Sequence, residues 1–276
     1  MSAEYDELSG ADFTPDEREH FIGLEDKRKR RLRARKFLLA FVITFFIIVA
    51  ALALITTFFK VDTIIVEGSE RYDFGSIVKT SGISKDDLIF MISDSNVEKA
   101  LYDNFPFVRS VKIIREYPST VTIEIEEEVP KFYFDFKDEY FVVGSKMKVL
   151  ERFAEYDRMV SVYTDLIPVT LPEIKTAIVS FDVEFISEKK SKHVLEAIQY
   201  LYDCKMLDGI TKIDLSLRFE MNVSYEDRIT VEFGGIKDFK DKLDFANGII
   251  KTYSSKATGV VYVENIVKAY ALIEDD

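Results

Sequence analysis

Residues 104–130, NFPFVRSVKIIREYPSTVTIEIEEEVP, decide how the first half of the chain folds. β-branched and aromatic residues dominate two runs, 107–117 and 120–128, and Pro118 with Ser119 separates them, which is typical of two strands joined by a turn. In the second run, apolar and polar residues alternate: Val121, Ile123 and Ile125 against Thr122, Glu124 and Glu126. The alternation predicts a sheet with one apolar face and one wet, acidic face.

The residues before this stretch complete a small module. Residues 61–68, VDTIIVEG, are β-branched and end at a glycine, which predicts a strand and its stop. Residues 72–80 and 96–104 have helical spacing, and Asn96 is the expected N-cap of the second helix. The order of elements predicts a β-α-α-β-β domain over 60–129 that buries one sheet face under two helices.

Residues 130–276 predict a second α+β domain with a mainly antiparallel sheet. Residues 132–136 and 140–143 have the pattern of a hairpin. Helices are expected from about 187 and over about 238–254, because apolar side chains recur there at helical spacing. Further strands are expected at 213–217, 220–225, 229–233, 259–264 and 266–273.

An uncharged run of 23 residues, 37–59 (FLLAFVITFFIIVAALALITTFF), precedes both domains. As a helix it would be about 34 Å long, enough to cross a hydrocarbon core of about 30 Å, so it predicts a transmembrane helix. Two alternatives are weaker. A buried core helix is rarely free of charge over such a length, and a cleaved signal peptide, which 51–53 (ALA) would fit, rarely has an n-region as long as 1–36.

Charge is distributed unevenly along the chain. Basic side chains crowd into residues 27–36 (KRKRRLRARK), so the positive-inside rule predicts that the tail 1–36 is cytoplasmic and the rest lies outside. Residues 1–26 are acidic and polar, which predicts disorder. The formal net charge of −12 falls on residues 60–276, which argues against nucleic acid as the main partner. The single cysteine allows no intramolecular disulfide.

Candidate catalytic groups are few. Only one of the two histidines, His193, follows the uncharged run, and without a Gly-x-Ser-x-Gly motif we interpret it as a surface or boundary side chain. Glu126 and Glu128 share a strand face and are interpreted as solvated charge in preference to a glycosidase pair. Residues 234–235 (GG) lack the lysine and serine of a phosphate loop and predict a hairpin or helix-entry turn. Cys204 is expected to be a half-buried side chain within a helix. No catalytic, metal-ligating or cofactor-binding residue is predicted.

The strand motifs resemble the POTRA domain of the bacterial cell-division proteins FtsQ and DivIB. The family's pattern of paired strands is met by Pro106, Val108, Val111, Ile113, Arg115, Pro118, Thr120, Val121, Ile123, Ile125 and Glu127. The second strand usually ends in Arg-x-Pro, and here it ends in Glu128-Val129-Pro130.

The likeness continues into the second domain. Residues 140–150 resemble the family's hairpin, with Gly144 where Asp is usual and Met147 where Gly is usual. Further segments, 171–174, 213–216 and 229–234, are similar to the family's "L-P-x-[IL]", "i-D-l-s" and "v-x-[FL]-G" motifs, so the resemblance covers about 37–272.

The resemblance implies a non-enzymatic bitopic scaffold that bridges early and late proteins of the divisome at the septum. It implies partners of the FtsL and FtsB/DivIC type, which are small single-span coiled-coil proteins, and a contact through the last strand region, about 266–273. There we expect Lys268, Tyr270 and Leu272 to face the partner, with Tyr253 and Tyr262 as neighbours. The other face would carry Val267, Ala269 and Ala271. Alternatively, this strand only completes the core.

Two other functions are compatible with such a chain. A POTRA-bearing secretion or chaperone component would be expected to carry a β-barrel or tandem POTRA repeats, and the sequence has neither pattern. A membrane-anchored cell-wall hydrolase would require that the part after the uncharged run degrades peptidoglycan. No cofactor, nucleic acid or small-molecule substrate is implied by any residue pattern in the chain.

Overall fold

The computed structural model describes residues 15–179 and 183–274, apart from the side chains of 15–33, Glu188 and Lys190. The chain forms two compact units, Met1–Lys60 and Val61–Asp276.

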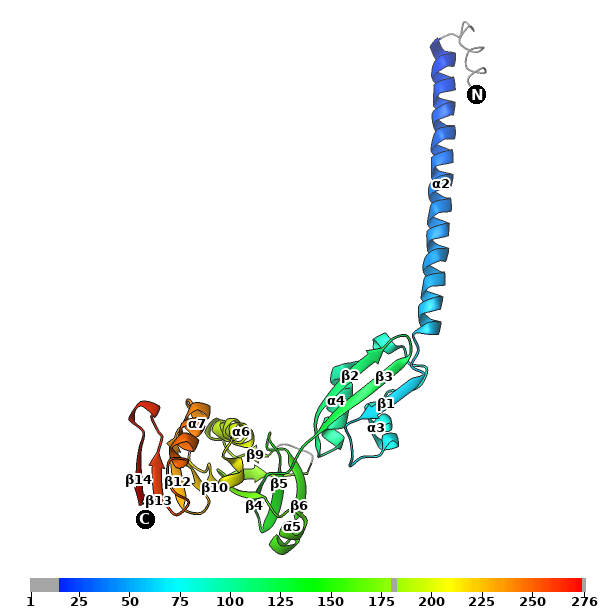
Figure 1. Ribbon diagram of the computed structural model, residues 1–276. Helices are drawn as coiled ribbons and strands as arrows, with labels where there is room; N and C mark the ends of the chain where they lie inside the picture. The colour runs from blue at the N-terminus through cyan, green and yellow to red at the C-terminus, as the bar shows by residue number, and fades with distance from the viewer. Residues whose placement is uncertain (1–14, 180–182, 275–276) are drawn as a thin grey trace. The chain divides into compact units, whose positions relative to one another are not determined.

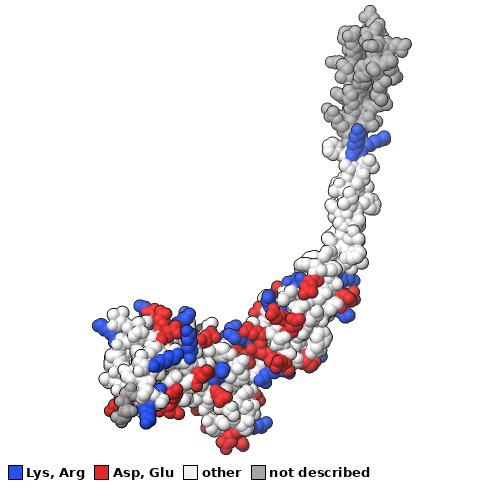
Figure 2. Space-filling model, viewed as in Figure 1, with Lys and Arg blue, Asp and Glu red and all other residues white. Residues whose placement is uncertain are grey.

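The described residues of the first unit contain one helix, α2 (Pro15–Phe58). Its segment Ala34–Phe58 spans 25 residues with a mean hydropathy of 3.1 and has no buried side chains, so its length and composition suit a membrane span. Figure 2 shows this segment in white, apart from a few blue basic side chains at its N-terminal end. The sequence predicts a disordered tail, but residues 15–26 are helical, and proline at the first helical position favours such a start. Residues 1–14 lie outside the described residues.

The second unit begins with a module of three strands and two helices, here called the three-stranded module. Its elements are β1 (Thr63–Glu67), α3 (Phe74–Ser81), the 3₁₀ turn η1 (Ile89–Met91), α4 (Asp94–Asn104), β2 (Val108–Glu116) and β3 (Thr120–Glu127). β3 lies in the middle, parallel to β1 and antiparallel to β2. The predicted β-α-α-β-β order is confirmed (Figure 1).

The two helices of this module start at capping side chains. Asp73 caps α3, because its carboxylate accepts from the Ser76 amide at 2.9 Å. Ser93 caps α4 in the same way, by accepting from the amide of Asn96. The prediction that Asn96 is the N-cap is wrong, because the helix begins two residues earlier, at Asp94.

Nine of the remaining described strands form one sheet. They are β4 (Phe132–Phe136), β5 (Glu139–Val143), β6 (Val149–Phe153), β7 (Ile167–Thr170), β10 (Ile210–Asp214), β11 (Met221–Tyr225), β12 (Ile229–Gly234), β13 (Thr258–Tyr262) and β14 (Tyr270–Glu274). The spatial order is β14-β13-β12-β11-β10-β7-β4-β5-β6. Five of the eight adjacent pairs are antiparallel, which confirms the mainly antiparallel sheet.

Two helices, α6 (Glu188–Tyr202) and α7 (Phe239–Ile250), bury their apolar faces in the core of this sheet. A shorter helix, α5 (Tyr156–Val162), contributes Met159 to a second, smaller cluster with Val142 and Phe153. The rest of the segment forms a two-stranded ribbon, β8 (Ile174–Thr176) with β9 (Glu184–Phe185), and a 3₁₀ turn, η2 (Leu207–Gly209).

The end of the chain differs from the single strand predicted over 266–273. Residues Ile266–Lys268 form a 3₁₀ turn, η3, and only Tyr270–Glu274 form strand β14. The side chain of Asn265 accepts from the Val267 amide at 3.0 Å and so caps the turn. A local side-chain bond therefore replaces strand pairing in these residues.

A buried lysine lies where the three-stranded module meets the nine-stranded sheet. Lys148, in the turn between β5 and β6, is 1% exposed. Its Nζ donates to the backbone oxygens of Tyr102, Phe105 and Val108, at 2.7, 2.9 and 3.2 Å. Two of these oxygens lie at the C-terminal end of α4, where the helix dipole favours a cation. The bonds fix the turn to the end of that helix.

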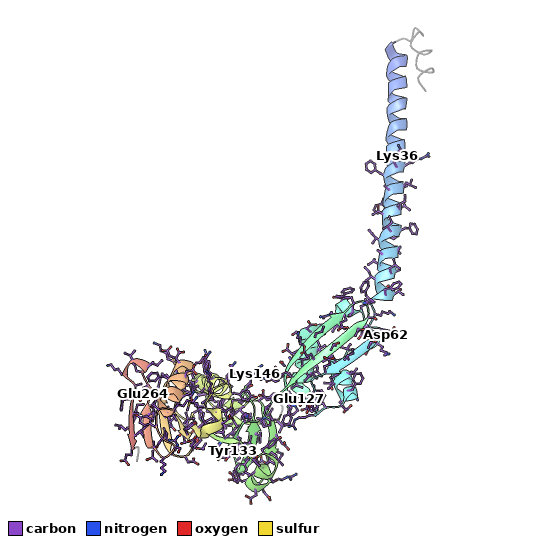
Figure 3. All side chains as sticks on the ribbon, viewed as in Figure 1. Lys36, Asp62, Glu127, Tyr133, Lys146 and Glu264 are labelled. Atoms are coloured by element: carbon purple, nitrogen blue, oxygen red, sulfur yellow. The ribbon has the colours of Figure 1, made fainter. Side chains whose placement is uncertain are left out.

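A buried glutamate crosses the same junction. Glu128, directly after β3, is 3% exposed, and its carboxylate accepts from the amide and the hydroxyl of Ser145 at 3.0 and 3.1 Å. Figure 3 labels Lys146 in the same turn and Glu127 at the end of β3. The sequence analysis interpreted Glu128 as solvated charge; that interpretation was wrong, because the turn that buries it comes from 17 residues further along the chain.

Candidate functional site

The edge of the nine-stranded sheet at β14 is the candidate site. β14 pairs with β13 in antiparallel register, from Thr258 opposite Glu274 to Tyr262 opposite Tyr270. It is the last strand in the order of the sheet, and among the described residues no strand pairs with its other side. Such an edge presents a row of backbone N–H and C=O groups that another chain can pair with. Figure 1 shows β14 in red at this edge, beside β13.

The two faces of β14 have different surroundings. Ala271 and Ile273 pack against the core that α7 helps to form. Tyr270 and Leu272 point to the opposite face and are 55% and 63% exposed. The strand alternation that the sequence predicts for these two residues is therefore present, and it leaves both of them accessible.

Neighbouring strands extend this exposed face. The rings of Tyr262 and Tyr270 stack with their centroids 4.7 Å apart and an angle of 18° between the planes. Val260 lies opposite Leu272 in the register, so the two pairs form one aromatic and aliphatic patch. Desolvation raises the pKa of the Tyr262 phenol, and the charge of Glu232 and the neighbouring Tyr270 raise it further.

The other predicted partner residues lie elsewhere. Lys268 is exposed, but it belongs to η3, so the prediction that it alternates with Tyr270 along one strand was wrong. Val267 was placed on the inner face and is instead 91% exposed. Tyr253 lies in the turn after α7, and no hydrogen bond or ring contact of the described residues joins it to the patch. The patch thus consists of Val260, Tyr262, Tyr270 and Leu272, with Val267 exposed in the adjacent turn.

Val260 and Val267 were missed by the sequence analysis. Val260 joins the patch through its register with Leu272, which periodicity within one strand does not reveal. Val267 is exposed because Asn265 turns the chain before it. The dipeptide Glu264-Asn265 is a turn signal that could have marked this break.

The side chains considered for catalysis, His193 and Glu126, each contact other groups of the protein. His193 is 2% exposed, and its Nε2 lies 2.9 Å from the backbone oxygen of Leu215. The interpretation as a surface or boundary histidine was wrong, because α6 turns it toward the core. Glu126 is exposed and lies beside Arg109, whose Nη1 is 3.2 Å away. Among the described residues, no group of three or more His, Cys, Asp or Glu side chains is arranged to hold a metal ion.

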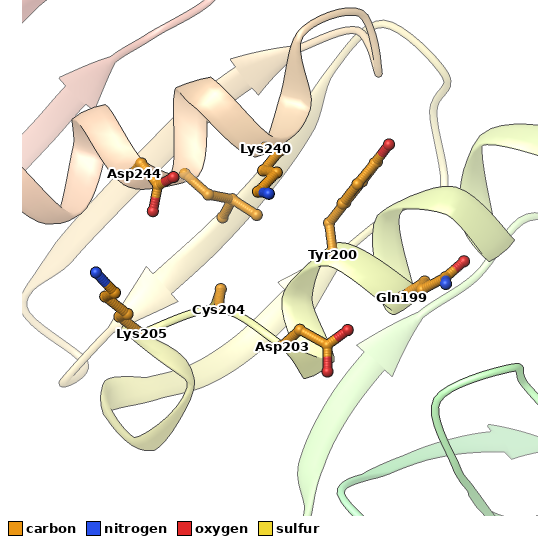
Figure 4. Close-up of a pocket in the computed structure, with 8 residues that line it drawn as sticks. Gln199, Tyr200, Asp203, Cys204, Lys205, Lys240 and Asp244 are labelled. Atoms are coloured by element: carbon orange, nitrogen blue, oxygen red, sulfur yellow. The ribbon is translucent and has the colours of Figure 1, made fainter. Parts of the chain in front are cut away.

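A cavity of about 420 Å³ lies between the end of α6 and α7. Figure 4 shows Lys205, Lys240 and Asp244 around it, with Cys204 between the two helices. The sequence predicts Cys204 inside a helix, but the residue lies after the end of α6. Its side chain is half-buried, as expected. Burial raises the pKa of its thiol to about 11, so the group stays protonated at neutral pH.

Gly234 ends β12, and Gly235 begins the bend that leads into α7. Gly234 has a φ of +63°, in the left-handed region that glycine adopts without strain. The ammonium group of Lys242 is buried above the turn and donates to the backbone oxygens of Phe233 and Gly235 at 2.8 and 2.9 Å. Desolvation lowers the pKa of Lys242. Lys242 therefore provides hydrogen-bond donors for the carbonyl groups of Phe233 and Gly235.

Comparison with known proteins gives a consistent result. A family model described as "POTRA domain, FtsQ-type" matches residues 59–128. The cell division protein DivIB of Bacillus subtilis is 25% identical over 263 residues, which cover 90% of each chain. The chain is therefore similar to proteins of the FtsQ/DivIB family over most of its length. DivIB of Clostridium botulinum strain Hall is 23% identical over 238 residues, 86% of this chain and 90% of that protein. FtsQ of Corynebacterium glutamicum is 24% identical over 210 residues, 74% of this chain and 86% of that protein.

The structure accounts for two residues at which the chain departs from the usual FtsQ/DivIB pattern. A Cβ at Gly144 would overlap Cγ and Cδ of Glu128, so the glycine provides the space that the buried glutamate occupies. Met147 has a φ of +59°, where the family usually has glycine, and its side chain is completely buried. Burying a methionine side chain stabilises the fold by about 1.5–3 kcal/mol, which offsets the cost of about 1–2 kcal/mol for a left-handed non-glycine residue.

Proposed function

We propose that this chain is a non-enzymatic, single-pass scaffold of the bacterial divisome that bridges early and late division proteins at the septum. The DivIB and FtsQ relatives are each named as cell division proteins, and they match most of the chain. The basic residues before the apolar span support an N-terminus in the cytoplasm and a C-terminus outside. The proposed division is a tail 1–36, a span 37–59, a POTRA domain 60–129 and a partner-binding domain 130–276.

The proposed partners are small single-span coiled-coil proteins of the FtsL and FtsB/DivIC type. The observation that carries this proposal is the unpaired edge of β14, with Tyr270 and Leu272 exposed beside it. An added strand would gain main-chain hydrogen bonds along the five residues of β14, and the patch of Val260, Tyr262, Tyr270 and Leu272 would provide side-chain contacts. Backbone pairing supplies affinity in this mode, and the exposed side chains select the partner.

The absence of an enzymatic role is also a proposal. Within the described residues, the buried ring of His193 faces a backbone oxygen, and the thiol of Cys204 is protonated at neutral pH. Neither group therefore provides the base and activated nucleophile that acyl or glycosyl transfer needs.

Affinity purification from dividing cells tests the partner surface. Four tagged proteins are compared: the natural chain, a chain truncated after Glu264, and the full-length variants Tyr270→Ala/Leu272→Ser and Val162→Ser. Val162 is the matched control, because it is 55% exposed on α5, near the opposite edge of the sheet. We expect the truncated chain and the double variant to lose small single-span partners and Val162→Ser to retain them. Retention of these partners by the double variant would contradict the proposal.

Localisation tests the division role separately. A fluorescent fusion of the full-length chain is expected to concentrate at the septum, and depletion of the protein should give filamentous or chained cells. A fusion that remains uniform around the envelope while cells divide would contradict a divisome role, whatever the protein binds in extracts.

A further inference from the structure

A lysine-lined cavity lies on the second unit, apart from the β14 patch. Its volume is about 1010 Å³, and α6, the turn between β5 and β6, and the ribbon of β8 and β9 contribute to it. Four lysines line it: Lys146 from the turn, Lys175 from β8, and Lys189 and Lys192 from α6. Figure 3 labels Lys146. The cavity is named the lysine pocket below.

The lysine pocket is a basic site in an acidic part of the chain. Residues 60–276 carry all of the net charge of −12, whereas the one acidic side chain among the described lining residues is Glu184. Glu184 pairs with Lys175 at 3.1 Å. None of the ion pairs among the described residues involves Lys146, Lys189 or Lys192. Ammonium groups that line the same pocket repel one another, and an anionic ligand would relieve this repulsion.

The pocket-lining side chains of α6 change from basic to apolar along the helix. Lys189, Lys192, Leu195 and Gln199 recur at intervals of three and four residues, so they form a stripe about 15 Å long at about 1.5 Å per residue. The lysines lie near the N-terminus of this 15-residue helix, where the helix dipole adds positive potential. Leu195, which is 47% exposed, follows on the same face. The stripe therefore changes from cationic to apolar along its length.

The walls and size of the pocket favour a peptide over a small anion. Val183 and Phe185 also line the pocket, so apolar side chains contribute to the same surface as the lysines. The volume lies at the upper end of the range of about 300–1,000 Å³ for ligand sites, far more than one phosphate would fill. The described lining contains no arginine, whose planar fork suits phosphate, and lysine ammonium groups can pair singly with separate carboxylates.

We propose that the lysine pocket binds an acidic segment of a partner protein that carries apolar side chains between its carboxylates. The carboxylates would pair with Lys146, Lys189 and Lys192, and the apolar side chains would contact Phe185 and Leu195. This surface does not involve β14, so it adds a second attachment point to the proposed scaffold. A stripe of about 15 Å accommodates about four or five residues of extended chain at about 3.3 Å each.

Fluorescence anisotropy tests the proposal with the full-length protein in a zwitterionic detergent. The probe is a labelled octapeptide of alternating glutamate and leucine; its glutamine-leucine analogue, an all-glutamate octapeptide and inorganic polyphosphate are compared with it. We expect the glutamate-leucine peptide to bind most tightly and to weaken with salt, since exposed charges are screened. The glutamine-leucine analogue should bind poorly.

Paired variants assign the binding to this pocket. Lys189→Gln/Lys192→Gln should weaken the glutamate-leucine peptide by about fivefold or more, given the usual strength of exposed ion pairs. Lys251→Gln/Lys256→Gln removes the same charge from exposed positions after α7 and should leave binding unchanged. Leu195→Ser should weaken the glutamate-leucine peptide but not the all-glutamate peptide. Equal binding by the two double-lysine variants, or tighter binding of polyphosphate than of the peptide, would overturn the proposal.

Discussion

The two edges of the nine-stranded sheet, at β6 and at β14, have different surroundings. At the β6 end, the turn that leads into the strand is buried, and Lys148 and Glu128 tie it to the three-stranded module. At the β14 end, the last strand has one neighbour, and its outward side chains are exposed. Buried polar groups must be paired, so the first end has one satisfactory geometry. The second end has backbone groups left to pair, which suits a binding surface.

The difference shows that the role of a lysine cannot be judged from its charge alone. Lys148 contacts three backbone oxygens and the face of the Tyr102 ring, 3.7 Å from Nζ. Lys268 at the other end is exposed in η3. The same side chain therefore fixes structure at one end and is available to a partner at the other.

The largest effect is expected from Lys148→Met. Methionine is apolar and of similar length, but it leaves three backbone oxygens without their donor, so we expect a loss of about 2–4 kcal/mol in the free energy of unfolding. Urea unfolding of the full-length protein in mild detergent, followed by circular dichroism, measures this loss. Lys146→Met is the control, because Lys146 is exposed in the same turn and should change stability by less than about 0.5 kcal/mol. Equal stability of the two variants would show that the junction contributes nothing.

A second effect is expected from Gly144→Ala. The added methyl would overlap the buried side chain of Glu128, whose carboxylate is held by Ser145, so the variant should lose about 1–3 kcal/mol. Gly248→Ala is the contrasting control: nothing lies within 4 Å of its new Cβ in α7, and the change should stabilise the helix by about 0.5–1 kcal/mol.

A double-mutant cycle separates the overlap from other effects of the alanine. In a Glu128→Ala background, Gly144→Ala should cost much less than it does alone, because the overlapping side chain is gone. Additive costs would mean that Gly144 is needed for its own backbone and not for the space it gives to Glu128.

A smaller and local effect is expected from Gly259→Ala at the β14 end. Gly259 has a φ of +150°, and a Cβ there would overlap the backbone oxygen of Leu272. Because only β13 holds β14, we expect the strand to loosen while the core is retained. Hydrogen exchange should become faster at residues 270–274 and remain unchanged in β4 and β5. Faster exchange throughout the sheet would show that this edge supports the whole fold.

The smallest effect on stability at neutral pH is expected from the thiol of Cys204. Its reactivity measures how well the core between the two ends of the sheet excludes solvent. Burial raises the pKa of its thiol from 9.0 to about 11, so native protein at pH 8 should react with a thiol reagent about a hundredfold more slowly than urea-unfolded protein. As the pH rises, the thiol of the folded state loses its proton at a higher pH than the thiol of the unfolded state. Its contribution to stability is therefore complete below pH 9 and is lost as the pH rises through about 11. Equal reactivity of native and unfolded chains would contradict a closed core.

Local patterns were sufficient for much of the fold. The alternation in 120–128, the helical spacing in 96–104 and the uncharged run 37–59 each depend on residues close in sequence, and each predicted element is present. Short elements were missed, since β7, with four residues, and β9, with two, have too little periodicity to be recognised.

The sequence by itself determined the apolar span, the β-α-α-β-β order and the strand alternation that exposes Tyr270 and Leu272. Only the tertiary structure decided which polar residues are buried and how the final strand begins. Glu128 is bonded to Ser145, 17 positions away, and Lys148 to Tyr102, 46 positions away. No local pattern distinguishes either buried charged side chain from a solvated one. His193 likewise meets Leu215, 22 residues away. Periodicity is a property of neighbouring residues, whereas the burial of a polar group depends on a partner that folding brings to it.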